Sequence, residues 1–249
     1  MSYEQKKFQM LKPCVVLAGG EGRRIQEITS GRVPKPMLTV AGHPFIYHKL
    51  NSLRFLGFSD IFVITGHQAS LISSYLTEVH LAGVNVHVLS DGPQLLGTGG
   101  GIRRHLSEFP ETFWVTYADS ITVCDISLAS TRLLDSKYGV MTVRDNSFGH
   151  ELGNVLLSDD RQWVTKYEKL QPSEALQWID FGLLRLSRAH FSKSPSGNFD
   201  LSVVLKSMVK SGELRALITD NNYFDIGTVE SYRRTCAIAD TSLTSEWWT

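Results

Sequence analysis

The sequence predicts an α/β fold with a mostly parallel central sheet, helices on both faces of that sheet, and a second half of mixed strand direction. Two observations predict this class. Through the first half, short β-type runs alternate with amphipathic segments of helix length, which is typical of βαβ units on a parallel sheet. After Asp145, strand-like runs follow one another with turns between them, and only one helical segment comes soon after.

The apolar pattern places the elements of the first half in order. Ile46, Leu50 and Leu53 recur at helical spacing. They predict a helix from Phe45 to Leu56 that ends at Gly57. The other elements expected are strands at 14–18, 61–65, 84–88, 113–117 and 139–143, and helices at 71–76 and around 127–134.

The second half is expected to be less regular. It comprises strands at 154–157, 163–168 and 179–186 and a helix at about 201–210. No linker rich in proline or glycine separates the halves, and no internal repeat with a period of about 20–50 residues is present. The sequence therefore predicts a single domain over residues 1–240, with a first half of about 13–145, a second half of about 146–240, and a tail at 241–249.

Composition and charge exclude several classes of protein. Of the 249 residues, 42% are hydrophobic, and 25 basic residues balance 25 acidic ones, so no overall positive charge attracts nucleic acid. No apolar run approaches the roughly 20 residues that span a bilayer. Three widely separated cysteines form neither a disulfide framework nor a zinc pattern, which favours a reducing compartment. We expect a cytoplasmic protein without a nucleic-acid or membrane partner, and a homo-oligomer is left open.

A glycine-rich segment follows the first strand directly. Gly19, Gly20 and Gly22 lie in the run Leu-Ala-Gly-Gly-Glu-Gly-Arg-Arg at 17–24. Glycines let backbone N–H groups approach a phosphate chain, and Arg24 adds charge-assisted hydrogen bonds. The segment has neither the Walker pattern nor the dinucleotide spacing, which argues against a dinucleotide-dependent oxidoreductase. A tight turn without a ligand is the alternative.

A lysine between two prolines follows the glycine segment, at Pro34-Lys35-Pro36. The prolines predict an extended segment that presents the Lys35 cation at a fixed place. A surface turn with a solvated lysine is the alternative. The combination with the glycine segment favours a function, because it is much rarer than either part.

A second glycine cluster spans residues 97–101, where Thr98 is the only residue that is not glycine. We expect it to form a loop that opens a helix at 102–106. Small residues there leave room for a flat base against the backbone, and the start of a helix favours anions. A strained loop without a ligand is the alternative.

Two acids lie next to the ends of predicted strands. Asp119 follows the strand at 113–117, at the edge of an open sheet where ligands bind. Asp225 follows a short apolar run and precedes a helix that begins near Thr228. Two carboxylates brought together repel unless a divalent cation lies between them, and Mg²⁺ prefers oxygen ligands. The pair therefore predicts a magnesium site, and a helix N-cap is the alternative for each acid alone.

Polar residues also mark the second half. Glu168 and Lys169 come at the end of one predicted strand, and Asn154 and Asp180 belong to other strands. A lysine beside hydrogen-bonding groups is suited to hold a sugar phosphate, with the other residues available for hydroxyls. Ordinary surface residues are the alternative. The eight histidines form no spacing typical of metal ligands.

Taken together, these motifs resemble those of the nucleotide-sugar pyrophosphorylases, which are sugar-1-phosphate nucleotidyltransferases. The resemblance covers residues 13 to 239 approximately and is greatest to the guanylyltransferases that act on mannose or heptose 1-phosphates. The shared motifs, in order, are Leu-Ala-Gly-Gly-x-Gly-x-Arg, Pro-Lys-Pro, Leu-Gly-Thr-Gly-Gly, an Asp after a strand, Glu-Lys near residue 168, and Asp-Ile-Gly-Thr-x-Glu-x-Tyr near the end.

The resemblance implies a Rossmann-like nucleotidyltransferase fold whose first half binds an NTP and whose second half binds a sugar 1-phosphate. With Mg²⁺ as cofactor, the products are an NDP-sugar and pyrophosphate. The resemblance implies that Arg24, Lys35, Asp119 and Lys169 are catalytic and that Asp119 and Asp225 bind the metal. The implied nucleotide contacts are Leu17, Ala18, Gly19, Gly20, Gly22, Arg24, Lys35, Gly97, Thr98, Gly99 and Asp119, and the implied sugar-phosphate contacts are Asn154, Glu168, Lys169, Asp180 and Gly182.

The base and the activity have alternatives. GTP with a mannose- or heptose-type 1-phosphate is the leading expectation, and a cytidylyl- or thymidylyltransferase acting on a hexose 1-phosphate is the first alternative. A catalytically silent, NDP-sugar-binding regulator is the second, because Arg23, an extra residue before Lys35, and Ala118 depart from the usual pattern. The usual Phe-Ser-Leu-Glu segment is also replaced, by Phe-Asp-Leu-Ser at 199–202.

Overall fold

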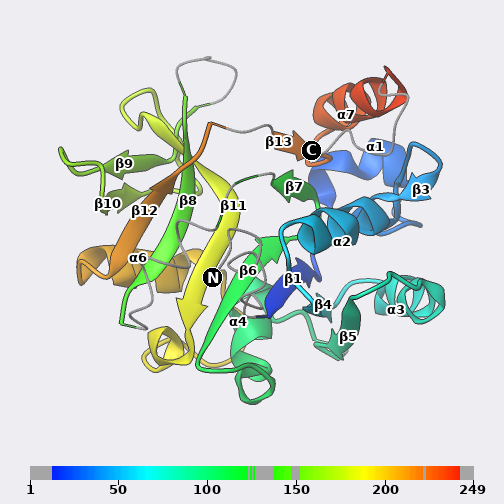
Figure 1. Cartoon of the computed structure of the whole chain (residues 1–249), viewed down its shortest axis with the longest axis horizontal. Coiled ribbons are helices and arrows are strands. Elements are labelled where there is room, and N and C mark those ends of the chain that lie inside the picture. Colours follow the sequence, from blue (N-terminus) through cyan, green and yellow to red (C-terminus); the bar gives the residue numbers. More distant parts are fainter. Residues whose placement is uncertain are drawn as a thin grey trace, which may run out of the picture. The chain divides into compact units, whose positions relative to one another are not determined.

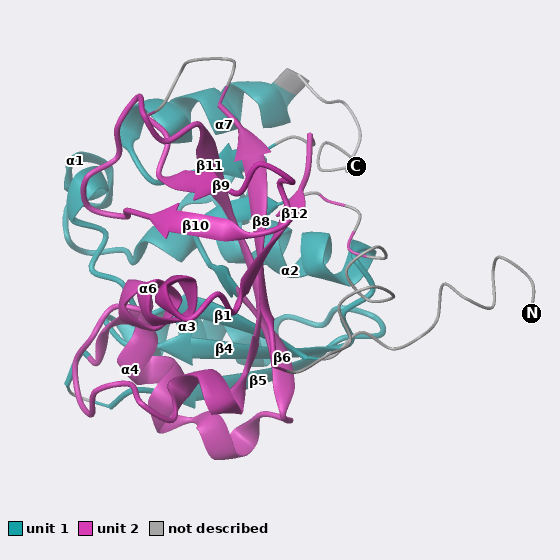
Figure 2. Ribbon diagram, turned by 90° about the vertical axis from the view of Figure 1, so that its left-hand side faces the viewer, with its two compact units in different colours: residues 1–95, 116–123, 222–249 teal, residues 96–115, 124–221 magenta. Residues whose placement is uncertain are grey.

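The computed structural model describes residues 13–92, 94–122, 124, 126, 137–146, 152–220 and 223–241. They form an α/β structure (Figure 1) that divides into two compact units, each discontinuous in sequence (Figure 2). Unit 1 comprises residues 1–95, 116–123 and 222–249, and unit 2 comprises residues 96–115 and 124–221. The helix expected around 127–134 and the tail at 242–249 lie outside the described residues. Within the described ranges, no helix is long and apolar enough to cross a membrane.

Unit 1 is built on parallel strands. β1 (Cys14–Ala18) pairs with β4 (Asp60–Thr65), and β4 pairs with β5 (Asn85–Ser90), both in parallel. The helix α2 (Phe45–Phe55) precedes β4 and α3 (Ala69–Glu78) precedes β5. Helices therefore connect successive parallel strands, which confirms the predicted βαβ organisation.

The helix α2 illustrates why the local predictions succeed. Ile46, Leu50 and Leu53 are each at most 1% exposed, so the apolar stripe read from the sequence is the buried face. Gly57 has a φ of +93°, and the N–H of Phe58 donates to the carbonyl oxygen of Leu53 at 3.1 Å. This is the glycine-terminated helix end that the sequence predicts.

The other elements of unit 1 lie between these strands or after them in the sequence. They include two two-stranded sheets, one formed by β2 and β3 and the other by β7 and β13. The bounds of these elements are β2 (Thr39–Val40), β3 (His43–Pro44), β7 (Ser120–Thr122), β13 (Tyr223–Asp225), α1 (Gln26–Thr29), α7 (Val229–Thr241), and the 3₁₀ turns η2 (Arg23–Ile25) and η3 (Lys35–Met37).

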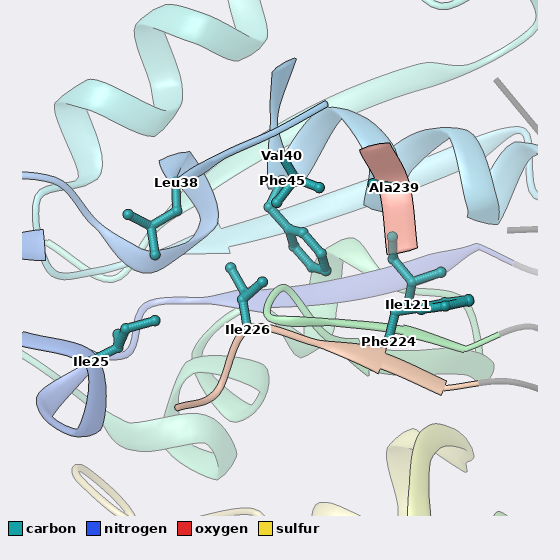
Figure 3. Close-up of a cluster of buried hydrophobic side chains, with 8 residues drawn as sticks. All are labelled: Ile25, Leu38, Val40, Phe45, Ile121, Phe224, Ile226 and Ala239. Carbon is teal, nitrogen blue, oxygen red and sulfur yellow. The ribbon is translucent and has the colours of Figure 1, made fainter. Parts of the chain in front are cut away.

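A cluster of buried apolar side chains joins the segments that carry the predicted site residues of unit 1 (Figure 3). Ile25 is adjacent to Arg24, and Phe224 and Ile226 flank Asp225. Burying each large side chain contributes about 1.5–3 kcal/mol, so the backbone next to each polar residue is held in place. The cluster consists of Ile25, Leu38, Val40, Phe45, Ile121, Phe224, Ile226 and Ala239.

A buried lysine fixes the strand that leads to Asp119. Lys49 of α2 is 0% exposed, and its Nζ donates to Oγ1 of Thr116 at 2.8 Å. Burial raises the pKa of the Cys14 thiol to about 12, although the charge of Lys49 acts to lower it. The hydrogen bond between Lys49 and Thr116 therefore ties α2 to the segment of unit 1 that continues into Asp119.

Unit 2 contains a sheet of mixed direction. β11 (Trp178–Ser187) is antiparallel to β8 (Gly139–Asp145), whereas β12 (Leu214–Ile218) is parallel to β8. β9 (Val155–Leu157) and β10 (Val164–Tyr167) pair antiparallel, and β9 also pairs with β11. The mixed strand direction predicted for the second half is thus confirmed. The first and last residues of each strand expected there differ from those of an observed strand by at most two positions.

The remaining elements of unit 2 are helical, apart from the strand β6, whose last two residues belong to unit 1. Their bounds are α4 (Gly97–Arg104), η4 (Leu106–Glu108), β6 (Thr112–Tyr117), η5 (Arg188–Phe191) and α6 (Ser202–Lys210).

Candidate functional site

The three glycines of the loop after β1 differ in the space around them. A Cβ on Gly19 would lie 3.3 Å from the backbone nitrogen of Gly66, in the loop after β4. Gly22 has a φ of +64°, and its carbonyl oxygen accepts a hydrogen bond from Ile25 N at 3.0 Å. A Cβ on Gly20 would meet no atom within 4 Å. Packing and turn geometry account for Gly19 and Gly22, whereas Gly20 leaves backbone open to a ligand.

Lys35 lies across the glycine loop and contacts Asp119. A Cβ on Gly22 would be 3.6 Å from Cε of Lys35, and Nζ of Lys35 is 3.0 Å from Oδ2 of Asp119. The lysine side chain is only 10% exposed. The prediction of an extended Lys35 is wrong, because Lys35 begins η3, which the bond from Leu38 N to Lys35 O at 3.1 Å closes. Pro36 is tolerated there because the first turn of a helix has unpaired N–H groups anyway.

The structure brings Asp119 and Asp225 together from distant parts of the sequence. β7 and β13 pair antiparallel, with Asp225 opposite Ser120, and the N–H of Ile226 donates to the carbonyl oxygen of Asp119 at 2.9 Å. The end of β1 reaches the same place, because Ala118 N donates to the carbonyl oxygen of Leu17 at 3.0 Å. Leu17 and Ala18 themselves are buried.

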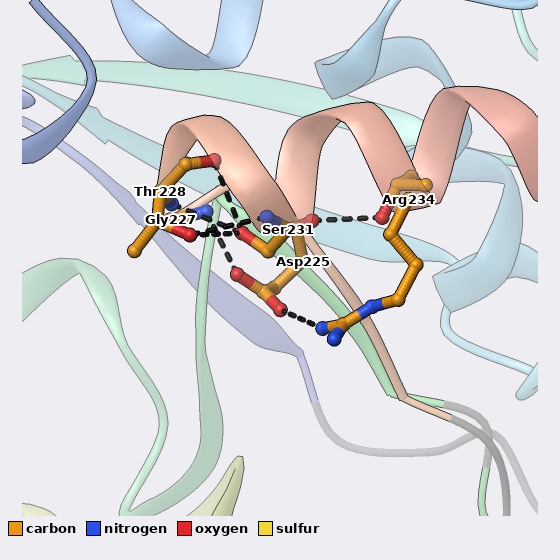
Figure 4. Close-up of polar contacts among 6 residues, drawn as sticks. Asp225, Gly227, Thr228, Ser231 and Arg234 are labelled. Atoms are coloured by element: carbon orange, nitrogen blue, oxygen red, sulfur yellow. Dashed lines mark hydrogen bonds and ion pairs between the residues drawn. The ribbon is translucent and has the colours of Figure 1, made fainter. Parts of the chain in front are cut away.

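Asp225 does not cap a helix (Figure 4). Its Oδ1 accepts a hydrogen bond from Gly227 N at 2.8 Å. Thr228 caps α7 instead: its Oγ1 accepts from Ser231 N at 3.1 Å, and Oγ of Ser231 accepts from Thr228 N at 3.0 Å. This reciprocal arrangement has the form of a capping box, so the N-cap alternative for Asp225 is wrong.

One oxygen of Asp225 remains available for a cation. Asp225 is 9% exposed, and its Oδ2 is buried without a hydrogen bond, with Nη2 of Arg234 3.5 Å away. An unpaired buried carboxylate oxygen is costly unless a positive charge compensates it. Among the described residues, no group of three or more metal-binding side chains occurs. Two carboxylates nevertheless fit Mg²⁺, because it takes its other ligands from water and phosphates.

The two arginines of the glycine loop differ in their surroundings. Arg23 pairs with Glu21 at 2.7 Å and its side chain is 78% exposed. Arg24 is exposed as well, but its Nη2 lies 3.9 Å from the position of a Cβ on Gly227. Arg24 is therefore next to the turn that follows Asp225, and unit 1 brings all its predicted polar site residues into one neighbourhood.

The second glycine cluster does not precede a helix but forms the start of α4. The helix expected at 102–106 is present but begins earlier, at Gly97, so the glycines belong to it and do not form a loop before it. Residues 197–200 lie directly against these glycines. A Cβ on Gly99 would overlap the ring of Phe199, and one on Gly100 would overlap the carbonyl oxygen of Gly197. The N–H groups of Gly99 and Gly100 donate to the carbonyl oxygen of Phe199 at 3.0 and 3.2 Å. The chain itself occupies the space that these two glycines leave.

Thr98 is also engaged within unit 2. Its Oγ1 donates to Oδ2 of Asp200 at 3.0 Å and accepts a hydrogen bond from Leu201 N at 2.8 Å. Gly97 has a φ of +70°. Close approach and backbone conformation therefore explain this segment structurally, and the base contacts of Gly97, Thr98 and Gly99 stay a prediction.

Three of the predicted sugar-phosphate residues form one hydrogen-bonded network. Oδ1 of Asn154 accepts from Asp180 N at 2.8 Å, and the Asp180 carboxylate accepts from Gly182 N at 3.0 Å. Tyr167 OH donates to the other carboxylate oxygen of Asp180 at 3.2 Å. Burial raises the pKa of Asp180. Tyr167 is not among the residues predicted from the sequence, where its only signal is its place next to Glu168.

Glu168 and Lys169 each have a charged partner in unit 2. Oε2 of Glu168 is 2.7 Å from Nζ of Lys206, and this hydrogen bond lowers the pKa of Glu168. Nζ of Lys169 is 2.7 Å from Oδ2 of Asp200. Asp200 and Lys206 are not among the residues predicted from the sequence, although the aspartate in place of serine in the Phe-Asp-Leu-Ser segment is a visible signal.

Comparison with known proteins identifies the family of the chain. Residues 14–176, more than half of the sequence, match the MobA-like NTP transferase domain. The chain belongs to this family. Because its relatives are sugar-1-phosphate nucleotidyltransferases, the family expected from the sequence is confirmed.

Two relatives illustrate the range of lengths among proteins similar to this MobA-like NTP transferase. It is 30% identical to the UTP–glucose-1-phosphate uridylyltransferase of Synechocystis sp., over 88% of this chain and 61% of that protein. It is 26% identical to the D-glycero-α-D-manno-heptose 1-phosphate guanylyltransferase of Campylobacter jejuni, over 88% of this chain and 96% of that protein. The chain thus spans about three fifths of the first relative and nearly all of the second.

Solved structures share the fold of this MobA-like NTP transferase. HddC from Yersinia pseudotuberculosis, in a complex with GMP-PN, has a TM-score of 0.76 at 25% identity, covering 91% of this chain and 99% of that one. A Bacillus anthracis protein described as a putative glucose-1-phosphate thymidylyltransferase has a TM-score of 0.77 at 20% identity, covering 95% and 98%. The predicted Rossmann-like α/β fold is therefore confirmed.

Proposed function

We propose that this protein transfers a nucleotidyl group from an NTP to a sugar 1-phosphate, forming an NDP-sugar and pyrophosphate. One observation carries the proposal: the glycine loop, Lys35, Asp119 and Asp225 lie in one neighbourhood of unit 1. An open glycine backbone next to a lysine and two carboxylates suits a nucleoside triphosphate and its divalent cation.

The proposed reaction depends mainly on electrostatic stabilisation of the charge that develops in its transition state. An oxygen of the sugar phosphate attacks the α-phosphorus of the NTP, and pyrophosphate leaves from the opposite side. The attacking oxygen is already anionic, so no general base is required. Arg24 and Lys35 are assigned to the triphosphate, and each well-placed contact contributes about 3 kcal/mol to stabilising the developing charge.

The proposal includes Mg²⁺, held by the carboxylates of Asp119 and Asp225. When bound, the ion offsets the charge of the phosphates. The residues of the chain prepare that site: Gly227 N fixes one oxygen of Asp225 and leaves Oδ2 without a hydrogen bond, while Lys35 orients the Asp119 carboxylate.

The sugar phosphate is assigned to residues of unit 2. Lys169 supplies the positive charge for its phosphate. Glu168 and the network of Asn154, Asp180 and Gly182 supply acceptors and donors for its hydroxyl groups. The partly buried Asp180 carboxyl, held by Tyr167, gives this network a fixed geometry, which discrimination between hydroxyl arrangements requires.

GTP with a mannose- or heptose-type 1-phosphate is the substrate pair we favour. The Campylobacter jejuni relative is a heptose 1-phosphate guanylyltransferase of nearly the same length, and HddC was solved with GMP-PN. The base contacts assigned to Gly97, Thr98 and Gly99 belong to this proposal. So does a cytoplasmic location, suggested by three cysteines that form no disulfide in the part of the chain that the structure describes.

A substrate screen tests the proposal. The purified protein is incubated with Mg²⁺, each of the four NTPs and a panel of mannose, heptose and glucose 1-phosphates, and pyrophosphate release is measured. We expect turnover with at least one pair, greatest with GTP. Asp119→Ala should abolish it, whereas Asp160→Asn, at an exposed turn, should not. Absence of turnover with every pair, together with tight binding of an NDP-sugar, would instead support the regulator.

A further inference from the structure

Asp200 connects two parts of unit 2 that the proposed function assigns to different substrates. Its Oδ2 is 2.7 Å from Nζ of Lys169 and 3.0 Å from Oγ1 of Thr98. Its Oδ1 accepts a hydrogen bond from Ser202 N at 2.9 Å, at the start of α6. One carboxylate therefore holds the sugar-phosphate lysine, the first turn of α4 and the first turn of α6.

The fourth contact of this arrangement closes a ring. Leu201 N donates to Oγ1 of Thr98 at 2.8 Å, so Thr98 contacts both the side chain of Asp200 and the backbone beside it. The position of Asp200 relative to α4 is thus fixed by two hydrogen bonds of the Thr98 hydroxyl, one to the Asp200 carboxylate and one from the N–H of the next residue. A lysine bonded to a carboxylate held in this way loses much of the freedom of its long side chain before any ligand binds.

The electrostatics of the pair are consistent with a persistent contact. Partial burial acts to raise the pKa of Asp200, but the hydrogen bond and charge of Lys169, together with the hydrogen bonds of Ser202, outweigh it and lower the pKa to about 2. The carboxylate is therefore ionised throughout the physiological range. A neutral side chain at this position could not supply such a charge, so the ion pair depends on the aspartate.

We propose that Asp200 is a positioning residue that holds Lys169 beside the start of α4, so that the lysine is oriented for the phosphate of the sugar substrate. The inference rests on the proposed function for the role of Lys169. It adds that this role depends on a carboxylate linked to the helix assigned to the base. Loss of the carboxylate should weaken sugar-phosphate binding more than nucleotide binding.

Kinetics of three variants test the role. Asp200→Asn removes the charge, and Asp200→Ser restores the residue usual in the family and provides a second variant if the first does not fold. For both we expect the KM for the sugar 1-phosphate to rise about tenfold, the effect typical of losing a hydrogen bond to a charged group, with the KM for the NTP changed less than threefold. Asp160→Asn is the matched control, because Asp160 also accepts from a hydroxyl and a backbone N–H but forms no ion pair with a lysine among the described residues.

The same measurement in a Lys169→Met background separates positioning from a general structural effect. If Asp200 acts through Lys169, Asp200→Asn should add less than twofold to the KM of Lys169→Met. A full tenfold effect in that background would overturn the proposal. An unchanged or lower KM for the sugar phosphate in the Asp200 single variants would overturn it as well.

A measurement without substrates keeps the inference independent of the proposed function. Acylation of Lys169 by an amine-reactive reagent uses the nitrogen lone pair and so requires release from Asp200. Peptide mass spectrometry should show Lys169 labelled several-fold faster in Asp200→Asn than in the wild type or Asp160→Asn. Equal rates would overturn the inference even in an active enzyme. Faster labelling in a protein without turnover would instead leave the contact established and count against the proposed function.

Discussion

Nζ of Lys35 lies 3.0 Å from Oδ2 of Asp119, although 84 positions separate the two residues in the sequence. The contact places a nearly buried cation beside a carboxylate that is 32% exposed. In the proposed reaction, the lysine thereby serves the triphosphate and orients a metal-binding acid at the same time.

Replacement of Lys35 should therefore affect activity far more than stability. We expect Lys35→Met to lower kcat about a hundredfold or more, because it removes a charge that stabilises the transition state. The free energy of unfolding should change by less than about 1 kcal/mol, since water can solvate the partly exposed Asp119. Initial rates and urea unfolding measure the two effects, with the exposed Lys210→Met as control. A loss of stability as large as the loss of activity would contradict this role.

The contact between Arg234 and Asp225 predicts how the chain tunes its cation site. Arg234 lies 3.5 Å from the Asp225 oxygen that lacks a hydrogen bond, and its side chain is 49% exposed. We expect Arg234→Gln to tighten binding of a divalent cation about threefold, which is the effect expected from removing one screened surface charge. Asp225→Asn should weaken binding strongly, because it removes a carboxylate ligand. Mn²⁺ titration followed by electron paramagnetic resonance measures both without turnover. Identical affinity in Arg234→Gln and the wild type would argue against competition.

The glycines of α4 predict a large difference between two similar substitutions. Gly99→Ala places a Cβ into the ring of Phe199, whereas Gly20→Ala places one where no atom lies within 4 Å. Overpacking should lower the free energy of unfolding of Gly99→Ala by about 3 kcal/mol, and Gly20→Ala should be neutral for stability. Denaturant unfolding compares the two. Because Gly20 is assigned to the phosphates, the stable variant should still bind the NTP more weakly.

The lowered pKa of Asp200 predicts a pH dependence of stability. Its pKa falls from an ordinary value of 3.8 to about 2 in the folded protein. A carboxyl with a lowered folded pKa adds stability above its unfolded pKa, and that contribution is lost as the pH falls through the folded value. The stability difference between the wild type and Asp200→Asn should therefore be constant above about pH 5 and shrink between about pH 4 and pH 2. A difference that grows towards low pH would contradict the ion pair.

Local pattern was sufficient for most elements but not for the glycine segments. The bounds of β1 and α2 follow from runs and spacings within a dozen neighbouring residues, so the sequence predicts them. The start of α4 was predicted as a loop, because glycine disfavours helix in isolation. Residues 197–200, about a hundred positions away, make that helix by accepting its N–H groups and filling its glycine face.

The sequence by itself determined the α/β class, the strands and the residues that carry charge, because apolar periodicity and residue chemistry are local properties. It also indicated that Asp119 and Asp225 form a pair. Only the tertiary structure decided which charges meet: Lys35 with Asp119, Arg234 with Asp225, and Lys169 with Asp200. The physical reason is that an ion pair forms only when two charged groups lie within a few ångströms of each other. The packing of segments that are distant in the sequence sets that separation.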